Sequence, residues 1–311
     1  MKITALAGGV GGAKLLDGLA QILPPEDLTA IVNTGDDFDH WGLRICPDLD
    51  TVCYTLAGLA NQDTGWGRRD ETWNVLIELS HLNGNDWFRI GDRDLATHIE
   101  RTERLAAGQT LTQIVRAFCN AWGIKSSILP MTDDAVATIV HTKDQGELAF
   151  QEYFVHQHCE PKVTSFTFAG IEYCRPANGV LEAINAADAV IFCPSNPWVS
   201  LDPILAVPGI LPAIKKKAVA LSISPIIGGI ALKGPAAKMF QELAITPSAL
   251  AVAEHYKGLI THFIMDISDR SLEQGISELG VKTKASDIVM KTEEDRRRLA
   301  SDVLNFIREK E

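Results

Sequence analysis

The chain of 311 residues is 46% hydrophobic and 22% charged, and its formal net charge is −11 at pH 7. This length exceeds an ordinary domain of ~100–200 residues, so we expect one α/β body with a sizeable insertion. An acidic chain without extended basic clusters lacks the cations that displace counterions from phosphates, which argues against a nucleic-acid partner.

Six scattered cysteines show neither a paired motif nor the spacing of a zinc site. They are typical of reduced, mostly buried thiols in a cytoplasmic protein. The first apolar run, residues 3–7, is too short for a signal peptide, and no apolar stretch of about 18 residues follows. We therefore expect a cytoplasmic protein that has no membrane partner.

The N-terminal segment alternates between strand-like and helix-like patterns. Residues 3–7 form a compact apolar run, and apolar residues recur at helical spacing over 13–22. A second apolar run, 28–32, precedes a polar loop over 33–50 and a helix over 51–60. Strands that alternate with helices predict a parallel sheet, which holds ligands at the C-terminal ends of its strands.

The middle of the chain has a different character. Helical patterns occur over 72–82, 94–107 and 110–122. Short β-type patterns follow over 135–141, 148–156 and 163–168. The first group predicts a helical insertion, and the second predicts a small antiparallel extension.

From residue 179 the α/β rhythm returns. Helices are predicted over 179–186 and 210–216, and strands over 189–193, 218–223 and 259–265. A final helix, which Thr292 and Asp295 cap, is predicted to end near residue 308. The predicted fold is α/β, a Rossmann-like, mostly parallel sheet with a helical insertion and a small β extension. Residues 1–61 and 159–311 would form the nucleotide-binding core, and 62–158 the insertion.

A glycine-rich loop, Gly8-Gly9-Val10-Gly11-Gly12, lies between the first predicted strand and helix. Glycines bring backbone N–H groups close to a phosphate, and a helix N-terminus adds partial positive charge. The loop lacks the spacing of a Walker A motif, and Lys14 replaces the third glycine of the dinucleotide fingerprint. It predicts a phosphate cradle, and the alternative is a tight turn without a ligand.

The loop after the second strand crowds five carboxylates into fifteen positions: Asp36, Asp37, Asp39, Asp48 and Asp50. Such a cluster repels itself unless cations neutralise it, and magnesium prefers one or two carboxylates together with phosphate oxygens. We therefore expect Mg²⁺ on Asp36 and Asp50. The alternatives are that Asp50 caps the following helix and that Asp36 forms an Asx-turn.

Three further loops carry polar candidates. Trp87 and Arg89 lie where a helix begins, and could stack on or clamp a planar or anionic ligand, although surface salt bridges are the alternative. Ser195 and Asn196 follow a strand, and Ser224 begins a similar loop that is followed by Lys233-Gly234-Pro235. These loops would outline a nucleotide cleft beside the glycine loop, unless they are ordinary crossover connections. His156 and His158 alternate as on a surface strand.

In combination, four motifs closely resemble the 2-phospho-L-lactate transferase family of coenzyme F-420 biosynthesis. They are the glycine loop followed by Ala13-Lys14, Asn33-Thr34-Gly35-Asp36-Asp37, Arg44-Ile45-Cys46-Pro47-Asp48-Leu49-Asp50-Thr51 and Pro194-Ser195-Asn196-Pro197. The resemblance implies transfer of a phospholactyl group from lactyl-2-diphospho-5'-guanosine to the deazaflavin Fo, which yields F-420-0 and GMP and requires magnesium. It also implies a homodimer with a Rossmann-like core, and contacts from Asp50 and Arg89 to Fo.

Within that reaction, the glycine-loop amides and the Mg²⁺ on Asp36 and Asp50 would stabilise charge that builds in the transition state. Lys14 would assist the leaving phosphate, and Asp50 is the candidate base if one is needed. The 62–158 insertion would contribute to the acceptor site. Whether the three-carbon acid is lactate or an enolpyruvyl relative stays open. The competing functions are a nucleotide or sugar-nucleotide binding regulator and, less favoured, an NAD(P)-dependent oxidoreductase.

Overall fold

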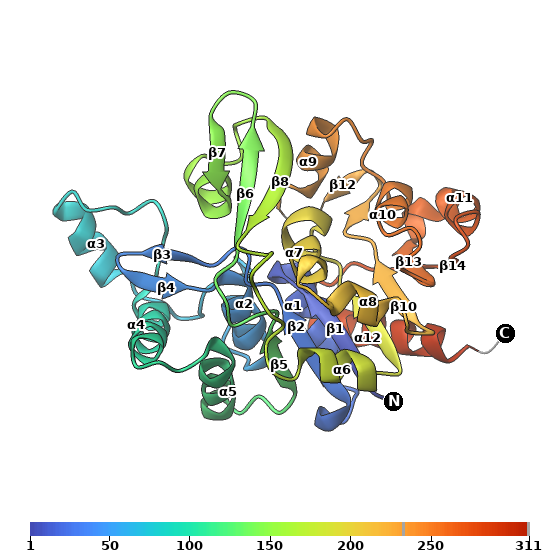
Figure 1. Ribbon diagram of the computed structural model, residues 1–311, viewed down its shortest axis with the longest axis horizontal. Helices are drawn as coiled ribbons and strands as arrows, with labels where there is room; N and C mark the ends of the chain where they lie inside the picture. The colour runs from blue at the N-terminus through green and yellow to red at the C-terminus, as the bar shows by residue number, and fades with distance from the viewer. Residues whose placement is uncertain (232–233, 310–311) are drawn as a thin grey trace.

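A seven-stranded parallel sheet forms the centre of the molecule (Figure 1), in a computed structural model that describes residues 1–231 and 234–309. The strand order is β14-β13-β10-β9-β1-β2-β5, and every neighbouring pair is parallel. The strands are β1 (Ile3–Ala7), β2 (Leu28–Val32), β5 (Ser127–Pro130), β9 (Ala189–Phe192), β10 (Ala220–Ile223), β13 (His262–Asp266) and β14 (Lys282–Ser286). This confirms the predicted α/β class.

Helices cover both faces of this sheet, so its strands are buried on both sides. Side chains of successive residues point to opposite faces, and Ala5 and Leu6 accordingly belong to two separate hydrophobic cores. One core includes α1 (Gly9–Ala20), α2 (Pro47–Leu56), α5 (Leu111–Trp122) and α12 (Glu293–Arg308). The other includes α6 (Val180–Ala186), α7 (Asp202–Ala206), α8 (Ile210–Ile214), α9 (Ala236–Glu242), α10 (Ala249–His255) and α11 (Glu273–Ser277).

The remaining elements project from this body (Figure 1). On one side lie α3 (Asn74–His81), α4 (Asp92–Ala106) and the hairpin of β3 (Phe38–His40) and β4 (Leu43–Ile45). A three-stranded antiparallel sheet consists of β6 (Ala137–Thr142), β7 (Gly146–Ala149) and β8 (Val163–Ala169). The short elements are the hairpin β11 (Ile226–Ile227) and β12 (Ile230–Ala231), the 3-10 turns Pro25–Asp27 and Ile267–Leu272, and the π-helical turns Glu152–His156 and Pro197–Leu201.

Several predicted elements are confirmed, and others need correction. Strands 3–7 and 28–32 and the capping box of Thr292 and Asp295 lie where the sequence placed them. The strand predicted over 148–156 is wrong: β7 ends at Ala149, and a π-helical turn contains His156. The helix predicted from residue 51 begins earlier, at Pro47, because proline at a first helical position needs no hydrogen-bonded N–H.

Two sheets cross the predicted boundaries of the insertion. β5 lies within 62–158 but pairs with β2 at the edge of the central sheet. The three-stranded sheet takes β6 and β7 from the predicted insertion and β8 from the predicted core. The four-residue β5 was missed because so short a run has no readable period. The division into a core and an insertion stays a prediction.

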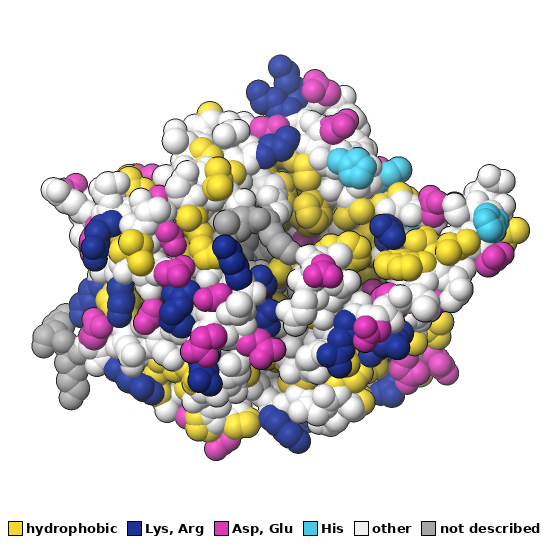
Figure 2. Space-filling view, turned by 180° about the vertical axis from the view of Figure 1, so that it is seen from behind, with side chains coloured by type: hydrophobic (Ala, Val, Ile, Leu, Met, Phe, Trp, Pro, Cys, Tyr) yellow, Lys and Arg dark blue, Asp and Glu magenta, His cyan; other side chains and the backbone are white. Residues whose placement is uncertain are grey.

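Charged side chains of both signs are interspersed over the lower part of the face in Figure 2, and hydrophobic side chains form a band above them.

All six cysteines are buried and free, as expected. None of the helices in the described ranges has the length and apolar character that a membrane crossing requires.

Candidate functional site

The glycine-rich segment is the first turn of α1 rather than a loop before it. β1 ends at Ala7, and α1 starts at Gly9, whose φ of +63° lies in the region that favours glycine. The N–H of Gly9 donates to Asp48 Oδ1 at 2.7 Å. A carboxylate therefore meets the positive end of α1, which is the environment that stabilises an anion.

Glycine is required here because the loop after β9 packs directly against this turn. A Cβ on Gly11 would lie 2.2 Å from the carbonyl oxygen of Pro194, and one on Gly12 would lie 2.8 Å from Ser195 Oγ. Ser195 Oγ donates to the carbonyl of Gly8 at 2.7 Å and is 3.2 Å from its N–H. The structure thus brings together the glycine segment, including Val10 at its centre, and Ser195.

Asp48 joins this turn to the acidic loop. Its Oδ2 accepts a hydrogen bond of 2.9 Å from Asn33 Nδ2, which also donates to the carbonyl of Val199 at 3.1 Å. Burial raises the pKa of Asp48 to about 6. Burial, and then the charge of Asp48, raise the pKa of Asp36 well above its ordinary value. Asp36 and Asp48 are therefore neighbouring buried acids.

Among the described residues, no basic side chain pairs with either acid. Over residues 1–231 and 234–309, neither Asp36 nor Asp48 forms an ion pair with a basic side chain, and buried Asp36 Oδ1 has no hydrogen-bond partner. Buried charges normally are paired or coordinate a metal. The oxygen-rich donor set fits a hard divalent cation such as Mg²⁺.

Asp50, which the sequence also suggested as a metal ligand, lies in a different environment. Asp50 Oδ1 accepts a hydrogen bond from Nη2 of Arg101, on α4, and both side chains are buried. Burial raises the pKa of Asp50, while Arg101 acts in the opposite direction. Because an arginine already compensates its charge, Asp50 is less suited than Asp48 to hold a cation beside Asp36.

Two further α4 residues extend this cluster. His98 Nδ1 lies 3.1 Å from Arg101 Nη1, and His98 Nε2 lies 3.4 Å from Asp94 Oδ1. Asp94 Oδ1 accepts a hydrogen bond of 2.6 Å from Tyr54 Oη. The ligand atoms of Asp50, Asp94 and His98 lie within 4.8 Å of one another. The Arg101 guanidinium supplies positive charge at this position, so we interpret the group as an ion-pair network rather than a metal site.

The sequence contains a signal for this network. Asp94, His98 and Arg101 are spaced i, i+4 and i+7, which places them along one face of a predicted helix. Such a stripe is usually solvent-exposed, but here Arg101 is 1% exposed. Its contacts with Asp50 on α2, the Arg44 carbonyl on β4 and the Phe118 ring on α5 are not evident from local sequence.

Asp94 also borders a cavity of about 180 Å³. The lining residues are Asn61, Thr64, Trp66, Gly67, Arg68, Glu71, Trp73, Arg89, Gly91 and Asp94. The guanidinium of Arg89 lies 4.6 Å from the ring centre of Trp73, within the range of a cation–π interaction. The cavity therefore combines flat aromatic surfaces with charged groups of both signs, which suits a planar polar ligand.

Trp87 and Arg89 lie in different surroundings, although the sequence suggested that both contact one ligand. Trp87 stacks on His156 with ring centres 5.1 Å apart and makes edge contacts with Phe88 and His40. Its neighbours come from the β3–β4 hairpin and from the π-helical turn after β7. It joins these segments, and it is not among the residues that line the cavity.

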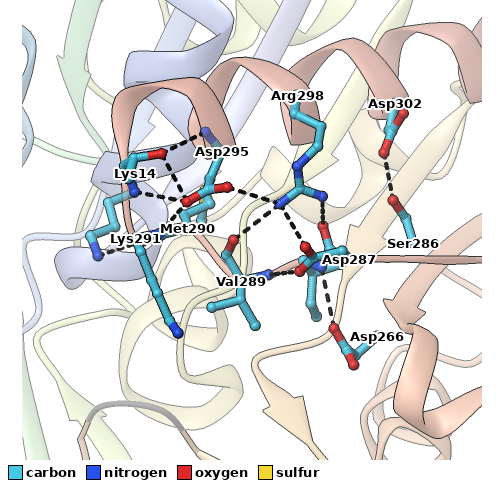
Figure 3. Close-up of polar contacts among 12 residues, drawn as sticks. Lys14, Asp266, Ser286, Asp287, Val289, Met290, Lys291, Asp295, Arg298 and Asp302 are labelled. Carbon is cyan, nitrogen blue, oxygen red and sulfur yellow. Dashed lines mark hydrogen bonds and ion pairs between the residues drawn. The ribbon is translucent and has the colours of Figure 1, made fainter.

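Lys14 is directed toward the connection before α12 (Figure 3). Its Nζ donates to the carbonyl of Met290 at 2.8 Å. Figure 3 also shows Arg298 contacting Asp287 and Val289 in the same connection and Asp295 in the first turn of α12. The contact with Met290 anchors Lys14 to the C-terminal segment, and its role at the leaving phosphate stays a prediction.

Asn196 and Ser224 each contact their own loop, and Asn196 also contacts Met239 on α9. Asn196 Oδ1 accepts from Trp198 N at 3.1 Å, and its Nδ2 is 3.3 Å from Met239 Sδ. Ser224 Oγ donates to the carbonyl of Ile226 at 2.8 Å. Both side chains therefore stabilise their own loops. Lys233, which the sequence placed beside Ser224, lies outside the described residues.

Comparison with known proteins gives this geometry a family. The chain is 44% identical to the phosphoenolpyruvate transferase of Streptomyces griseus over 93% of each chain, and 38% identical to the 2-phospho-L-lactate transferase of Methanosarcina acetivorans over 97% of each. A solved structure from Bacillus halodurans shares the fold, with 20% identity, a TM-score of 0.65 and 99% coverage of both chains. The family profile described as 2-phospho-L-lactate transferase CofD matches residues 3–308. The chain belongs to the 2-phospho-L-lactate transferase CofD family.

Proposed function

We propose that this protein transfers a phosphorylated three-carbon acid from a guanosine diphosphate donor to the primary hydroxyl of the deazaflavin Fo. The observation that carries the proposal is the contact between the N-terminus of α1 and the uncompensated acids, with Gly9 N and Asp48 Oδ1 2.7 Å apart. Backbone amides favour phosphate oxygens, and buried carboxylates favour a divalent cation. Family membership supports the transfer chemistry.

We assign Mg²⁺ to Asp36 and Asp48, in place of the pair Asp36 and Asp50. The first pair is buried, adjacent and without a cation among the described residues, whereas Arg101 compensates Asp50. When bound, the ion would supply positive charge beside the diphosphate oxygens. Asn33 holds Asp48 in place through its side-chain amide.

In the proposed reaction, the Fo hydroxyl oxygen forms a bond to the phosphorus nearer the three-carbon acid, and the bond from that phosphorus to the GMP phosphate oxygen breaks. The amides at the start of α1 hold phosphate oxygens, and Asp50 accepts a hydrogen bond from the attacking hydroxyl. That proton passes to Asp50 as the new bond forms, and the electrons of the broken bond stay on the departing GMP phosphate. Phosphoryl transfer depends mainly on positioning and electrostatics, so Asp50 need not be a strong base.

The cavity beside Asp94 is the proposed acceptor site, because Arg89 and Trp73 offer a clamp and a stacking surface. The identity of the three-carbon acid is a separate question. The sequence resemblance implied lactate, whereas the relatives at 42–44% identity from Streptomyces griseus and Streptomyces coelicolor are named phosphoenolpyruvate transferases. We therefore propose the enolpyruvyl donor first and the lactyl donor second.

The test is mass spectrometry of reactions that contain Fo, magnesium and either lactyl-2-diphospho-5'-guanosine or its enolpyruvyl counterpart. GMP and a product of Fo plus the phospho-acid should appear together, faster with the preferred donor. A rate of donor turnover that does not depend on Fo would refute the proposal. Saturable guanosine nucleotide binding without product would favour the alternative, a nucleotide-binding regulator.

A further inference from the structure

Arg101 is a buried cation that links two parts of the chain far apart in sequence. It lies on α4, is 1% exposed, and contacts Asp50 in the first turn of α2. A second donor, Nη1, reaches the carbonyl of Arg44 at 3.2 Å, at the strand that precedes α2. One guanidinium thus fixes both the start of α2 and the segment leading into it.

The neighbouring histidine shows how the charges are arranged. Arginine has donors only, so His98 Nδ1, 3.1 Å from Arg101 Nη1, must act as the acceptor in that contact. The ring proton of neutral His98 then lies on Nε2, which faces Asp94 Oδ1 at 3.4 Å. His98 therefore cannot donate from Nδ1 to Asp50 Oδ2, which lies 3.7 Å away.

This arrangement leaves the two oxygens of Asp50 in different states. Oδ1 is held by Arg101, whereas Oδ2 is buried and has no hydrogen-bond partner within the described ranges. A carboxylate oxygen kept free in this way can accept a hydrogen bond from a substrate hydroxyl. The contact from Arg101 Nη2 to Oδ1 opposes a rotation of the carboxylate that would move Oδ2 from this position.

We propose that Arg101 is a positioning residue of the transferase: it holds the Asp50 carboxylate in one orientation and presents Oδ2 to the acceptor hydroxyl. This inference rests on the proposed function. Through His98, whose Nε2 lies 3.4 Å from Asp94 Oδ1, the same guanidinium is also connected to Asp94, which borders the acceptor cavity. Arg101 touches no reacting atom, and its effect passes through Asp50.

The primary test is Arg101→Lys, since lysine keeps the buried charge but cannot span Asp50, His98 and the Arg44 carbonyl at once. Removing the charge entirely would leave Asp50 buried and unpaired, which threatens folding. We expect kcat/KM for Fo to fall about 10²-fold, the loss typical of a misplaced reacting group. The KM for the guanosine diphosphate donor should stay within about twofold of the native value, because the donor binds at the α1 side.

Arg104→Lys is the matched control. Arg104 lies one turn further along α4, and its guanidinium is 5.8 Å from the Phe118 ring, as Arg101 is at 5.9 Å. It pairs with Glu100 at 2.7 Å and reaches no residue of the acidic loop. Its kcat/KM should match that of the native protein.

A double-mutant cycle separates positioning from a general structural effect. If Arg101 acts through Asp50, adding Arg101→Lys to Asp50→Asn should cause no further loss in kcat/KM for Fo. The inference is overturned if Arg101→Lys lowers kcat/KM for Fo by the same factor in the Asp50→Asn background as in the native protein. Native-like kinetics of Arg101→Lys itself also overturn it.

Chemical rescue provides a second test. If Arg101→Ala folds, added guanidinium should restore part of its rate, and sodium chloride at equal ionic strength should not.

The native protein distinguishes this inference from the proposed function. Native protein that releases no GMP from either donor refutes the proposed function, and the inference falls with it. If the native protein turns the donor over and Arg101→Lys has native-like kinetics, the inference is refuted and the proposed function stands.

Discussion

The N–H of Gly9 donates to Asp48 Oδ1 at 2.7 Å, which joins the first turn of α1 to the first turn of α2. α1 follows β1 directly, and α2 follows the neighbouring strand β2 after the β3–β4 hairpin. Both helices therefore begin at the C-terminal edge of the sheet. The contact places an anion-binding helix end directly against a buried acidic group.

Asp48→Asn should separate stability from activity. The change removes one of two neighbouring buried negative charges, but the new amide NH2 faces a donor, either Gly9 N–H or Asn33 Nδ2, so the melting temperature of the metal-free protein should stay close to the native value. GMP release should fall about 10–100-fold, in the range seen when metal-supporting groups are removed. Thermal denaturation and product assays measure the two effects. Asp39→Asn is the control, since Asp39 is 73% exposed, and equal activity loss in both variants would contradict the assignment.

Gly11→Ala should destabilise the protein and abolish most turnover. Its Cβ would lie 2.2 Å from the carbonyl oxygen of Pro194, a backbone atom that cannot rotate away. Overpacking of this kind costs about 1–3 kcal/mol, so the denaturant midpoint should fall. Gly275→Ala is the control, because its nearest neighbours are side-chain atoms at 3.7 Å and 3.8 Å. A Gly11→Ala protein as stable as the control would show that the first turn of α1 and the loop after β9 are not in contact.

Arg89→Ala should weaken use of the acceptor without affecting the donor. Loss of the guanidinium removes the charge that sits 4.6 Å from Trp73 in the cavity, so the KM for Fo should rise about tenfold. Steady-state kinetics with each substrate varied in turn provide the measurement. Arg93→Ala removes an exposed arginine from the adjacent helix start and should change neither KM. A rise in the donor KM alone would place the acceptor elsewhere.

The capping box of α12 should make stability depend on acid pH. Hydrogen bonds from the Thr292 backbone and hydroxyl lower the pKa of Asp295 from 3.8 to about 2. A lowered folded-state pKa means that the stabilisation is present above 3.8 and is lost as the pH falls toward 2. Asp295→Asn should therefore lower the melting temperature at pH 7, and the difference from the native protein should shrink near pH 2.

The control for the α12 prediction is Glu294→Gln, which changes an exposed carboxylate in the same turn. Its melting temperature should follow that of the native protein across this range. A constant difference between Asp295→Asn and the native protein from pH 7 to pH 2 would rule out the capping carboxylate as the cause.

Much of the fold could be predicted because its signals are local. The apolar run at 3–7, the glycines after it and the capping box of Thr292 and Asp295 each depend on residues within a few positions of one another. The 148–156 prediction failed where no local feature distinguishes a strand from a π-helical turn. In that region, packing of Phe150 and Tyr153 in the core decides the conformation.

The sequence by itself determined the α/β architecture, the family motifs and the presence of an acidic loop after the second strand. Only the tertiary structure decided which acid does what, because Asp48 and Asp50 stand two positions apart at the start of α2 and therefore face different ways. Asp48 meets Gly9, and Asp50 meets Arg101, 51 residues further along the chain. Contacts over that separation depend on how helices pack, which no local pattern encodes.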